Sequence, residues 1–328
     1  MKNIKNKFNN FLSKRVILLF IIFTAVNLTA ILPSINFISD IFSHFIKQYL
    51  ILSFLFLIIF AYLSFTNKKF FIGVFASIIF SCMNFGLMYS ATRQTTKASI
   101  PENQTAENLS LGIVNVLTSN TNYEKLLKII SEQNSDILIL QEIDSIWLQN
   151  IKELKYTYPY YLEHPRDDNF GIAIYSKIPL TNSEIEYWTN FEVPVIKAEI
   201  KRGKNLYTIY GVHTLPPISK NYISTRNEML SKISNNIEKN NNVIVGGDLN
   251  TTIYSHAYRK IISQKRIQDA QTISKNQKGT WNTKHLPFFR ISLEHVLYKN
   301  SNIQIQSFEC GANFDSDHFP VFVNLNLY

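Results

Sequence analysis

Acidic residues are almost absent from the first hundred positions of this 328-residue sequence. These positions contain one acidic residue, Asp40, and ten Lys or Arg. The whole chain has 33 Lys or Arg and 24 Asp or Glu, so positions 101–328 carry 23 of each sign. The net charge of +9 therefore belongs to the N-terminal third. A domain that binds nucleic acid through its phosphates usually carries a surplus of Lys and Arg, so the neutral remainder argues mildly against that partner.

Cysteine is also scarce. Only Cys82 and Cys310 occur, the first within an apolar run and the second near the C-terminus. A disulfide within the C-terminal two-thirds is therefore excluded, and the cysteine count does not decide the cellular compartment.

Charged residues are missing from the interior of three apolar runs, which extend from Val16 to about Phe37, from Tyr49 to about Phe65 and from Phe70 to about Tyr89. Each approaches the roughly 20 residues that cross about 30 Å of hydrocarbon as a helix. Leu50 to Phe60 lacks the polar stripe of a soluble helix. A cleaved signal peptide is the alternative for the first run. The two further runs favour a membrane domain at residues 1–91 with three transmembrane helices.

The Lys and Arg beside these runs predict the orientation of the chain. Five precede the first run and Lys68 and Lys69 lie between the second and third, whereas only Lys47 lies between the first and second. We expect a multi-pass protein of the cell membrane with a cytoplasmic N-terminus and an extracytoplasmic C-terminal domain. Arg93 and Lys97, after the third run, oppose this orientation. The polar segment 92–110 reads as a linker.

Short apolar runs alternate with amphipathic segments from Leu111 onward, which predicts an α/β domain at residues 111–328. Helices are expected at Tyr123–Gln133 and Arg226–Lys239, the second with a capping box formed by Thr225 and Glu228. Several of the strand candidates are apolar on both faces and belong in the middle of a layered fold. These candidates are Gly112–Leu117, Asp136–Leu140, Gly171–Tyr175, Val193–Ile200, Leu206–Val212, Asn242–Val245, His295–Tyr298 and Val321–Asn326.

Polar residues stand at the ends of the predicted strands, where open α/β sheets place their chemistry. Gln141 and Glu142 follow the second strand candidate, and His213 follows the fifth. The sixth runs through Gly246 and Gly247, which would allow a sharp turn and leave room for a bulky substrate group, into Asp248, Leu249 and Asn250. Asp248 and Asn250 would point to the same side if the strand geometry persisted. Ser316, Asp317 and His318 precede the last strand.

Four segments carry a resemblance: Ile113 to Leu117 (IVNVL), Gln141-Glu142, Gly247 to Asn250 (GDLN) and Ser316 to Pro320 (SDHFP). In this order they resemble the motifs of the endonuclease/exonuclease/phosphatase superfamily, which includes pancreatic-type deoxyribonucleases, apurinic endonucleases, bacterial sphingomyelinases and inositol-polyphosphate 5-phosphatases. The segment Phe170 to Lys177 agrees, and the likeness covers about Leu111 to Leu327. It implies a four-layer sandwich of two packed β-sheets flanked by helices.

The resemblance also implies residue roles in a divalent-metal-dependent phosphoesterase. Glu142, Asn115 and Asp317 would bind Mg²⁺ or Mn²⁺, since hard cations prefer oxygen ligands. Asp248 would orient or deprotonate the attacking water, and His318 would donate to the phosphoryl group. Asn115, Asn250 and His213 would contact the substrate phosphate, with Asn250 and His213 also acting in catalysis. The family usually has an Asp before the strand at His295–Tyr298; Glu294 stands there, and we expect it still to orient His318.

Each of these residues has an ordinary structural reading when it is taken alone, as a solvated carboxylate, a turn former or a packed histidine. The order of the motifs reverses that reading for the site residues. His256, His285 and His295 are assigned to structure, and Arg166 and Trp281 to loops that line the pocket on slight support.

The substrate is not fixed by fold and metal site. With three membrane spans, the chain looks most like bacterial teicoplanin-resistance membrane proteins, which suggests a lipid-linked phosphate such as a polyprenyl pyrophosphate. The expected partners are therefore a phosphoester substrate and the lipid bilayer, with nucleic acid less favoured. A membrane-tethered nuclease and a catalytically inactive binding or sensor module are the alternatives. The sequence leaves the leaving group, the number of metals and the oligomeric state open.

Overall fold

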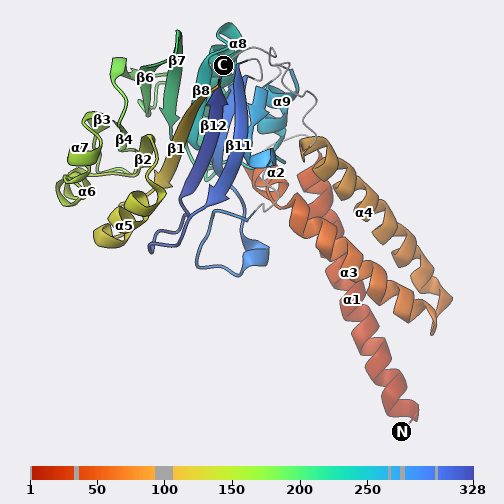
Figure 1. The fold of residues 1–328 in the computed structure, drawn as a ribbon. Coiled ribbons are helices and arrows are strands. Elements are labelled where there is room, and N and C mark those ends of the chain that lie inside the picture. The colour runs from red at the N-terminus through yellow and green to blue at the C-terminus, as the bar shows by residue number, and fades with distance from the viewer. Residues whose placement is uncertain (1, 33–36, 93–105, 265–266, 274–277, 300–301) are drawn as a thin grey trace. The chain divides into compact units, whose positions relative to one another are not determined.

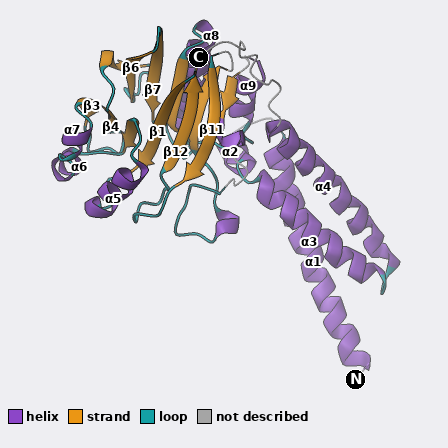
Figure 2. Ribbon diagram, in the orientation of Figure 1, coloured by secondary structure: helices purple, strands orange, loops and turns teal. Residues whose placement is uncertain are grey.

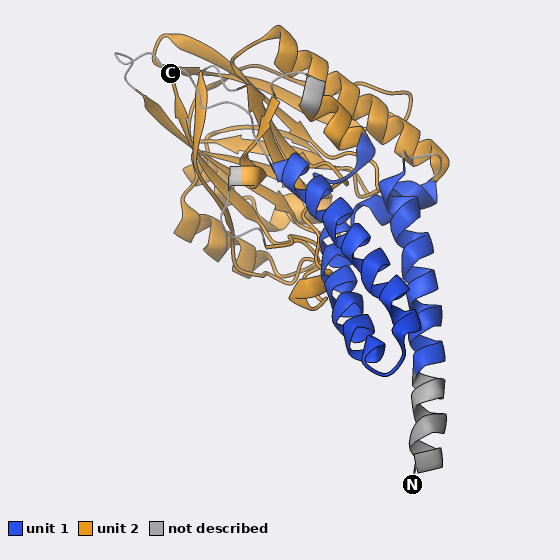
Figure 3. Ribbon diagram, turned by 90° about the vertical axis from the view of Figure 1, so that its right-hand side faces the viewer, with its two compact units in different colours: residues 1–93, 253–256 blue, residues 94–252, 257–328 orange. Residues whose placement is uncertain are grey.

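The computed structural model describes residues 2–32, 37–92, 106–264, 267–273, 278–299 and 302–328. The chain divides into two compact units (Figure 3). The first comprises residues 1–93 and 253–256, and the second comprises residues 94–252 and 257–328.

The N-terminal unit is helical, with α1 (Lys2–Ile31), α2 (Phe37–Ser43), α3 (Ile46–Ser64), the 3₁₀ turn η1 (Lys68–Phe70) and α4 (Phe71–Thr92). Three helical segments are long and apolar enough to cross a membrane: Ser13–Ile31, Ile46–Ser64 and Lys68–Thr92. This part of the predicted fold class is confirmed. The first helix ends before the predicted limit at Phe37, which instead begins α2, and residues 33–36 lie outside the described residues.

Polar side chains pair between the helices of this unit. The Asn27 amide nitrogen donates to Asn84 Oδ1 at 3.4 Å, and the Ser81 hydroxyl lies 2.9 Å from that of Ser53. Such pairs join apolar helices at fixed positions, because a polar group facing lipid would lack a partner.

Two six-stranded sheets form the C-terminal unit (Figures 1 and 2). The first has the order β11-β12-β1-β2-β4-β3 and the second the order β5-β6-β7-β8-β10-β9. The strands of the first sheet are β1 (Glu107–Asn115), β2 (Ile137–Gln141), β3 (Tyr160–His164), β4 (Ile172–Ser176), β11 (Ile303–Cys310) and β12 (Val321–Leu327). Those of the second are β5 (Leu180–Tyr187), β6 (Pro194–Arg202), β7 (Asn205–Val212), β8 (Val243–Asp248), β9 (Ile267–Asp269) and β10 (Glu294–Lys299).

Helices cover the outer faces of the sheets, so the fold is the predicted four-layer sandwich (Figure 2). The helices are α5 (Tyr123–Gln133), α6 (Ser145–Asn150), α7 (Leu154–Thr157), α8 (Lys220–Lys239) and α9 (His256–Gln264), with the 3₁₀ turns η2 (Ala270–Ile273) and η3 (Pro287–Phe289). The first three lie beside the first sheet, and α8 packs on the second.

Alternation along the strands builds two apolar layers, because successive side chains of a strand point to opposite faces. In β1, Leu111 and Ile113 join the core between the sheets, whereas Val114 joins the cluster under α5 with Leu126. Strands β2, β4 and β8 are buried at every residue. The interior strands are therefore held on both faces, which fixes the positions of their ends.

Two local predictions differ from the structure. Strand β1 begins at Glu107, within the segment expected to be a linker. Helix α8 begins at Lys220, and the Ser219 hydroxyl caps it by accepting from the Tyr222 amide. The predicted cap at Thr225 is wrong, because Thr225 lies buried inside the helix.

Candidate active site

The polar residues at the strand ends meet at one edge of the sandwich. In the first sheet, β1 and β2 run parallel with Asn115 opposite Gln141, and Glu142 follows directly. In the second sheet, β7 and β8 run parallel, so His213 and Asp248 stand at their carboxyl ends. Because both parallel pairs end at this edge, residues far apart in the sequence come together.

Asn115, Glu142, His213 and Asp248 form the centre of this group. Asn115 Nδ2 donates to Glu142 Oε1 at 2.8 Å and lies 3.4 Å from Asp248 Oδ2. His213 Nε2 lies 3.9 Å from Glu142 Oε1 and 3.7 Å from Asp248 Oδ2. Asn115, His213 and Asp248 are buried, and Glu142 is partly exposed.

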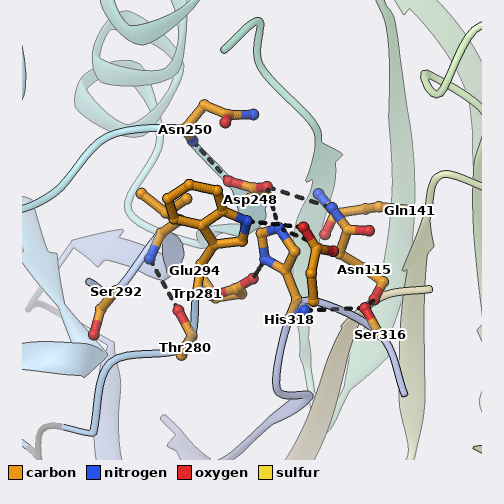
Figure 4. Close-up of polar contacts among 12 residues, drawn as sticks. Asn115, Gln141, Asp248, Asn250, Thr280, Trp281, Ser292, Glu294, Ser316 and His318 are labelled. Atoms are coloured by element: carbon orange, nitrogen blue, oxygen red, sulfur yellow. Dashed lines mark hydrogen bonds and ion pairs between the residues drawn. The ribbon is translucent and has the colours of Figure 1, made fainter. Parts of the chain in front are cut away.

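His318 completes the group from the loop that precedes β12 (Figure 4). Its Nδ1 is bonded to Glu294 Oε1, and its Nε2 lies 3.7 Å from Asp248 Oδ2 and 4.0 Å from Asp317 Oδ1. Glu294 begins β10 opposite Asp248 in the antiparallel register. The longer side chain at position 294 therefore makes the histidine contact that the family pattern led us to expect from an aspartate.

Two residues of the site have an uncommon backbone conformation. Glu142 has a φ of 63° and Asn250 a φ of 45°, a left-handed conformation that is uncommon for residues other than glycine. The Thr118 hydroxyl donates to the Glu142 carbonyl, and the Asn250 amide donates to Asp248 Oδ1 at 2.7 Å. These bonds stabilise the turns that follow β2 and β8.

Asn250 differs from its predicted orientation. The strand geometry does not persist beyond Asp248, and the Asn250 side-chain amide donates to the Thr214 carbonyl at 2.8 Å. Figure 4 shows its carboxamide extending away from Asp248. The assumption that placed both side chains on the same side is therefore wrong.

The two glycines of β8 serve close packing rather than a substrate. A Cβ on Gly247 would lie 1.8 Å from the Val212 carbonyl oxygen, and φ there is 153°. A Cβ on Gly246 would lie 3.0 Å from Ile113 of the other sheet. The expectation that these positions leave room for a substrate group is wrong.

Several positioning contacts come from residues to which the sequence gave no definite role. Trp281 Nε1 donates to Asp317 Oδ2 at 2.9 Å (Figure 4). The Ser316 hydroxyl donates to the Asn115 carbonyl and accepts from the His318 amide. Gln141 Nε2 donates to the Val212 carbonyl at 2.7 Å and so joins the two sheets beneath the site. Ser316 and Gln141 were visible as motif members, but their contacts depend on the fold.

The remaining candidates lie outside this group. Arg166 pairs with Asp168 in an exposed loop. His295 points to the opposite face of β10 from Glu294, where its Nδ1 lies 2.7 Å from Asp269 Oδ2. His285 lies exposed in the loop after Trp281, and His256 begins α9.

The two site histidines are in opposite electrostatic situations. Burial and the nearby His318 charge lower the pKa of His213 to about 3, so this ring is neutral. Burial would also lower the pKa of His318, but the charges of Glu294 and Asp248 and the Glu294 hydrogen bond raise it to about 10. His318 is therefore an imidazolium at neutral pH, held between carboxylates.

Burial also acts on the carboxyl groups. It raises the pKa of Asp248 against the lowering effect of the His318 charge, and it raises the pKa of Glu142 against the Asn115 hydrogen bond. For Glu294, burial is outweighed by the charge and hydrogen bond of His318, and the pKa is lowered. Burial therefore disfavours the charged forms of Asp248 and Glu142, whereas the His318 charge favours that of Glu294.

This donor set fits a divalent cation. Ligand atoms of Asp248, Glu294 and His318 all lie within 4.8 Å of one another, so this buried cluster could hold a metal. The Glu294–His318 hydrogen bond already engages Glu294 Oε1 and His318 Nδ1, whereas Glu294 Oε2 has no hydrogen-bond partner among the described residues. Asp317 Oδ1 is likewise buried with no hydrogen-bond partner among the described residues, and the charge of Asp317 contributes to raising the pKa of Glu142. Oxygen atoms are the ligands that a hard cation prefers.

Comparison with known proteins agrees with the geometry. The model of the endonuclease/exonuclease/phosphatase family matches residues 113–318, which is more than half of the chain. No curated protein matches the full sequence significantly.

Solved structures share the fold at low sequence identity. TDP2 from D. rerio, complexed with a single-strand DNA product, is 18% identical with a TM-score of 0.56, covering 67% of this chain and 99% of its own. A mannosyl-6-phosphatase from Bacteroides thetaiotaomicron is 17% identical with a TM-score of 0.55, covering 66% and 99%. A family protein from Bacteroides vulgatus is 17% identical with a TM-score of 0.57, covering 68% and 100%.

Proposed function

Because the chain belongs to the endonuclease/exonuclease/phosphatase family, we propose that it is a membrane-anchored, divalent-metal-dependent phosphoesterase that hydrolyses a phosphate ester or anhydride of a lipid-linked or small substrate. The observation that carries the proposal is the convergence of Glu142, Asp248 and Asp317 with the Glu294-bound His318 at one edge of the sandwich. A purely structural role would not require so many titratable side chains in one place.

Glu142, Asn115 and Asp317 would hold Mg²⁺ or Mn²⁺. When bound, this ion supplies positive charge against which phosphoryl oxygens are oriented and stabilised. Asn115 suits this position because its amide already orients Glu142, and the Ser316 hydroxyl fixes the Asn115 backbone.

Asp248 would take the proton of the attacking water. Burial raises the pKa of this carboxyl, which brings a weak base nearer to the working pH. The imidazolium of His318, fixed by Glu294, would donate toward the phosphoryl oxygens as negative charge builds on them. The neutral His213 would add a second donor, and Asn250 a contact to a phosphoryl oxygen.

Two observations and one resemblance proposed from the sequence support a lipid-linked substrate. The chain has three helices long and apolar enough to cross a membrane, its C-terminal two-thirds carries equal numbers of acidic and basic residues, and its layout resembles teicoplanin-resistance membrane proteins. With the N-terminus in the cytoplasm, the domain would face outward, where envelope lipids rather than the genome are within reach. A polyprenyl pyrophosphate is the corresponding candidate.

A membrane-tethered nuclease is the second candidate, since the D. rerio TDP2 structure of the same fold holds single-strand DNA. The neutral charge of residues 101–328 weighs against it. An inactive binding or sensor module is a third possibility, which the complete set of acidic site residues disfavours.

The deciding experiment uses purified full-length protein in detergent, with Mg²⁺ or with EDTA. Phosphate release from undecaprenyl pyrophosphate is measured beside nicking of a plasmid. We expect metal-dependent phosphate release without nicking, lost in Asp248→Asn. Nicking that Asp248→Asn abolishes would instead make the protein a nuclease, and inactivity in both assays would refute this substrate class.

A further inference from the structure

A rigid loop projects from the site. Residues 282–290, here called the site loop, connect Trp281 to Ile291, whose backbones pair with each other at 2.8 and 2.6 Å. At its base, Thr283 N donates to the Asp317 carbonyl, and Trp281 forms a bridge with His318. Figure 1 shows the loop, with its short helical turn, extending beyond the ends of the strands.

The tip of the site loop is apolar and exposed. Leu286 is 70% exposed and precedes a 3₁₀ turn, within which Phe289 is 54% exposed and Phe288 is also exposed. Exposed apolar side chains that occur singly are ordinary, but a cluster beside a site marks an interaction surface. The loop is not loosely held, because Arg290 donates to the carbonyls of His285 and Thr283.

The charge of this segment is one-sided. Lys278, Lys284 and Arg290 occur between positions 278 and 293, and no Asp or Glu lies among them. Three of the 23 basic residues of positions 101–328 therefore lie in this segment, and the next acidic residue is Glu294. Apolar residues flanked by cations match the surface of a bilayer with anionic lipids, where phosphates lie above the acyl chains.

We propose that the site loop docks on the surface of an anionic bilayer, with Leu286 and Phe289 among the acyl chains and Lys284 at the lipid phosphates. Such docking requires a bilayer, and the chain has three helices that are long and apolar enough to cross one. Docking would place the phosphate of a lipid-linked substrate at His318 while its hydrocarbon stays in the membrane. This consequence rests on the proposed function, whereas the docking itself does not.

A single-stranded nucleic acid is the competing occupant, because aromatic and basic residues also bind its bases and phosphates. The tip suits it less well. Leu286, the most exposed of the large apolar side chains in the loop, has no aromatic face on which a base could stack.

Spin labels test the docking without any activity measurement. The full-length chain, with Cys82→Ser and Cys310→Ser, is placed in bilayers that contain phosphatidylglycerol and labelled through Leu286→Cys. Tyr156→Cys is the matched control, since Tyr156 is 92% exposed on α7, away from the site loop. We expect the label at 286 to be reached by oxygen and shielded from a water-soluble nickel complex, and the label at 156 to show the reverse. Equal access of nickel to both labels would overturn the proposal, as would shielding that requires single-stranded DNA.

Activity separates docking from the reaction. In the same bilayers, Leu286→Ser with Phe289→Ser should lower hydrolysis of a lipid-linked phosphoester about tenfold or more and that of a water-soluble phosphoester less than about twofold, since only the first substrate needs the membrane surface. Tyr156→Ser should alter neither rate. Equal loss on both substrates would contradict a docking role. A shielded label at 286 in a protein that hydrolyses no phosphoester would support docking while refuting the proposed function.

Discussion

In each sheet of the C-terminal unit, a central parallel pair of strands is flanked on both sides by antiparallel strands. In the first sheet β12 and β4 flank the pair β1 and β2, and in the second β6 and β10 flank the pair β7 and β8. The same strand arrangement therefore presents two pairs of strand ends at one edge. The side chains that follow those ends are different.

The first sheet ends in Asn115 and Glu142, whereas the second ends in His213 and Asp248. The first pair, joined by a hydrogen bond, offers oxygen ligands, and the second offers a carboxyl group with a raised pKa beside an imidazole. His318 links the two, because it precedes β12 of the first sheet and bonds to Glu294 of the second. This difference suggests a metal-binding half and a proton-transfer half built on equivalent backbones.

The largest expected effect comes from the proton-transfer half. Asp248→Asn keeps the size of the side chain but removes the base, so kcat should fall about 10³-fold, a loss of about 4 kcal/mol of transition-state stabilisation. Because Glu142 and Asp317 remain, Mn²⁺ binding measured by electron paramagnetic resonance should stay within about threefold of the wild type. Loss of metal binding in this variant would contradict the proposed division into a metal-binding half and a proton-transfer half.

The metal-binding half should respond differently. Glu142→Gln should lower activity about 10²-fold at low Mg²⁺, with partial recovery at high Mg²⁺, because the neutral amide is a weaker ligand. The measurement is a Mg²⁺ titration of the rate beside Mn²⁺ binding. Glu163→Gln, which changes a carboxylate bonded to Lys155 and Tyr175 outside the site, is the control. If activity stays low at every Mg²⁺ concentration, Glu142 belongs with the proton-transfer residues.

The sequence predicted the interior strands of the two sheets better than their edge strands. All eight strand candidates correspond to interior strands, whereas β3, β5, β9 and β11, which the sequence analysis missed, are the four edges of the two sheets. An edge strand is paired on one side only and carries polar residues as protection, as in β5 (LTNSEIEY). Apolar patterning detects strands buried on both faces, so edges escape it.

The site shows the same limit. Residues at the ends of interior strands could be predicted to meet, because the sheet fixes those ends. The contact between Trp281 and Asp317 could not, since it depends on how two loops fold against each other. The direction of the Asn250 side chain was mispredicted because a positive φ interrupts the strand pattern.

The contact between His318 and Glu294, which joins the two halves, can be tested by the pH dependence of kcat/KM. In Glu294→Gln, His318 loses the carboxylate that contributes most to raising its pKa to about 10. The imidazolium is present below that pKa and lost as pH rises through it, so the alkaline limb of the kcat/KM profile should move to lower pH. At neutral pH we expect a fall of about 30-fold, in the range seen when a group that orients a functional residue is removed. An unshifted alkaline limb would show that His318 does not act as the cation.

The smallest expected effect concerns Trp281, which reaches the metal-binding half only through Asp317. Trp281→Phe keeps an aromatic ring but removes the donor to Asp317 Oδ2, so this carboxylate would lose its fixed orientation while remaining available to a cation. We expect Mg²⁺ activation to weaken about tenfold, as is typical when the partner of a metal ligand is lost. The matched control is Trp188→Phe, because Trp188 Nε1 donates to Glu186 at 2.6 Å in a position outside the site. A lower kcat at saturating Mg²⁺ with an unchanged activation constant would instead assign Trp281 to the proton-transfer half, beside the His318 ring that lies 6.4 Å away.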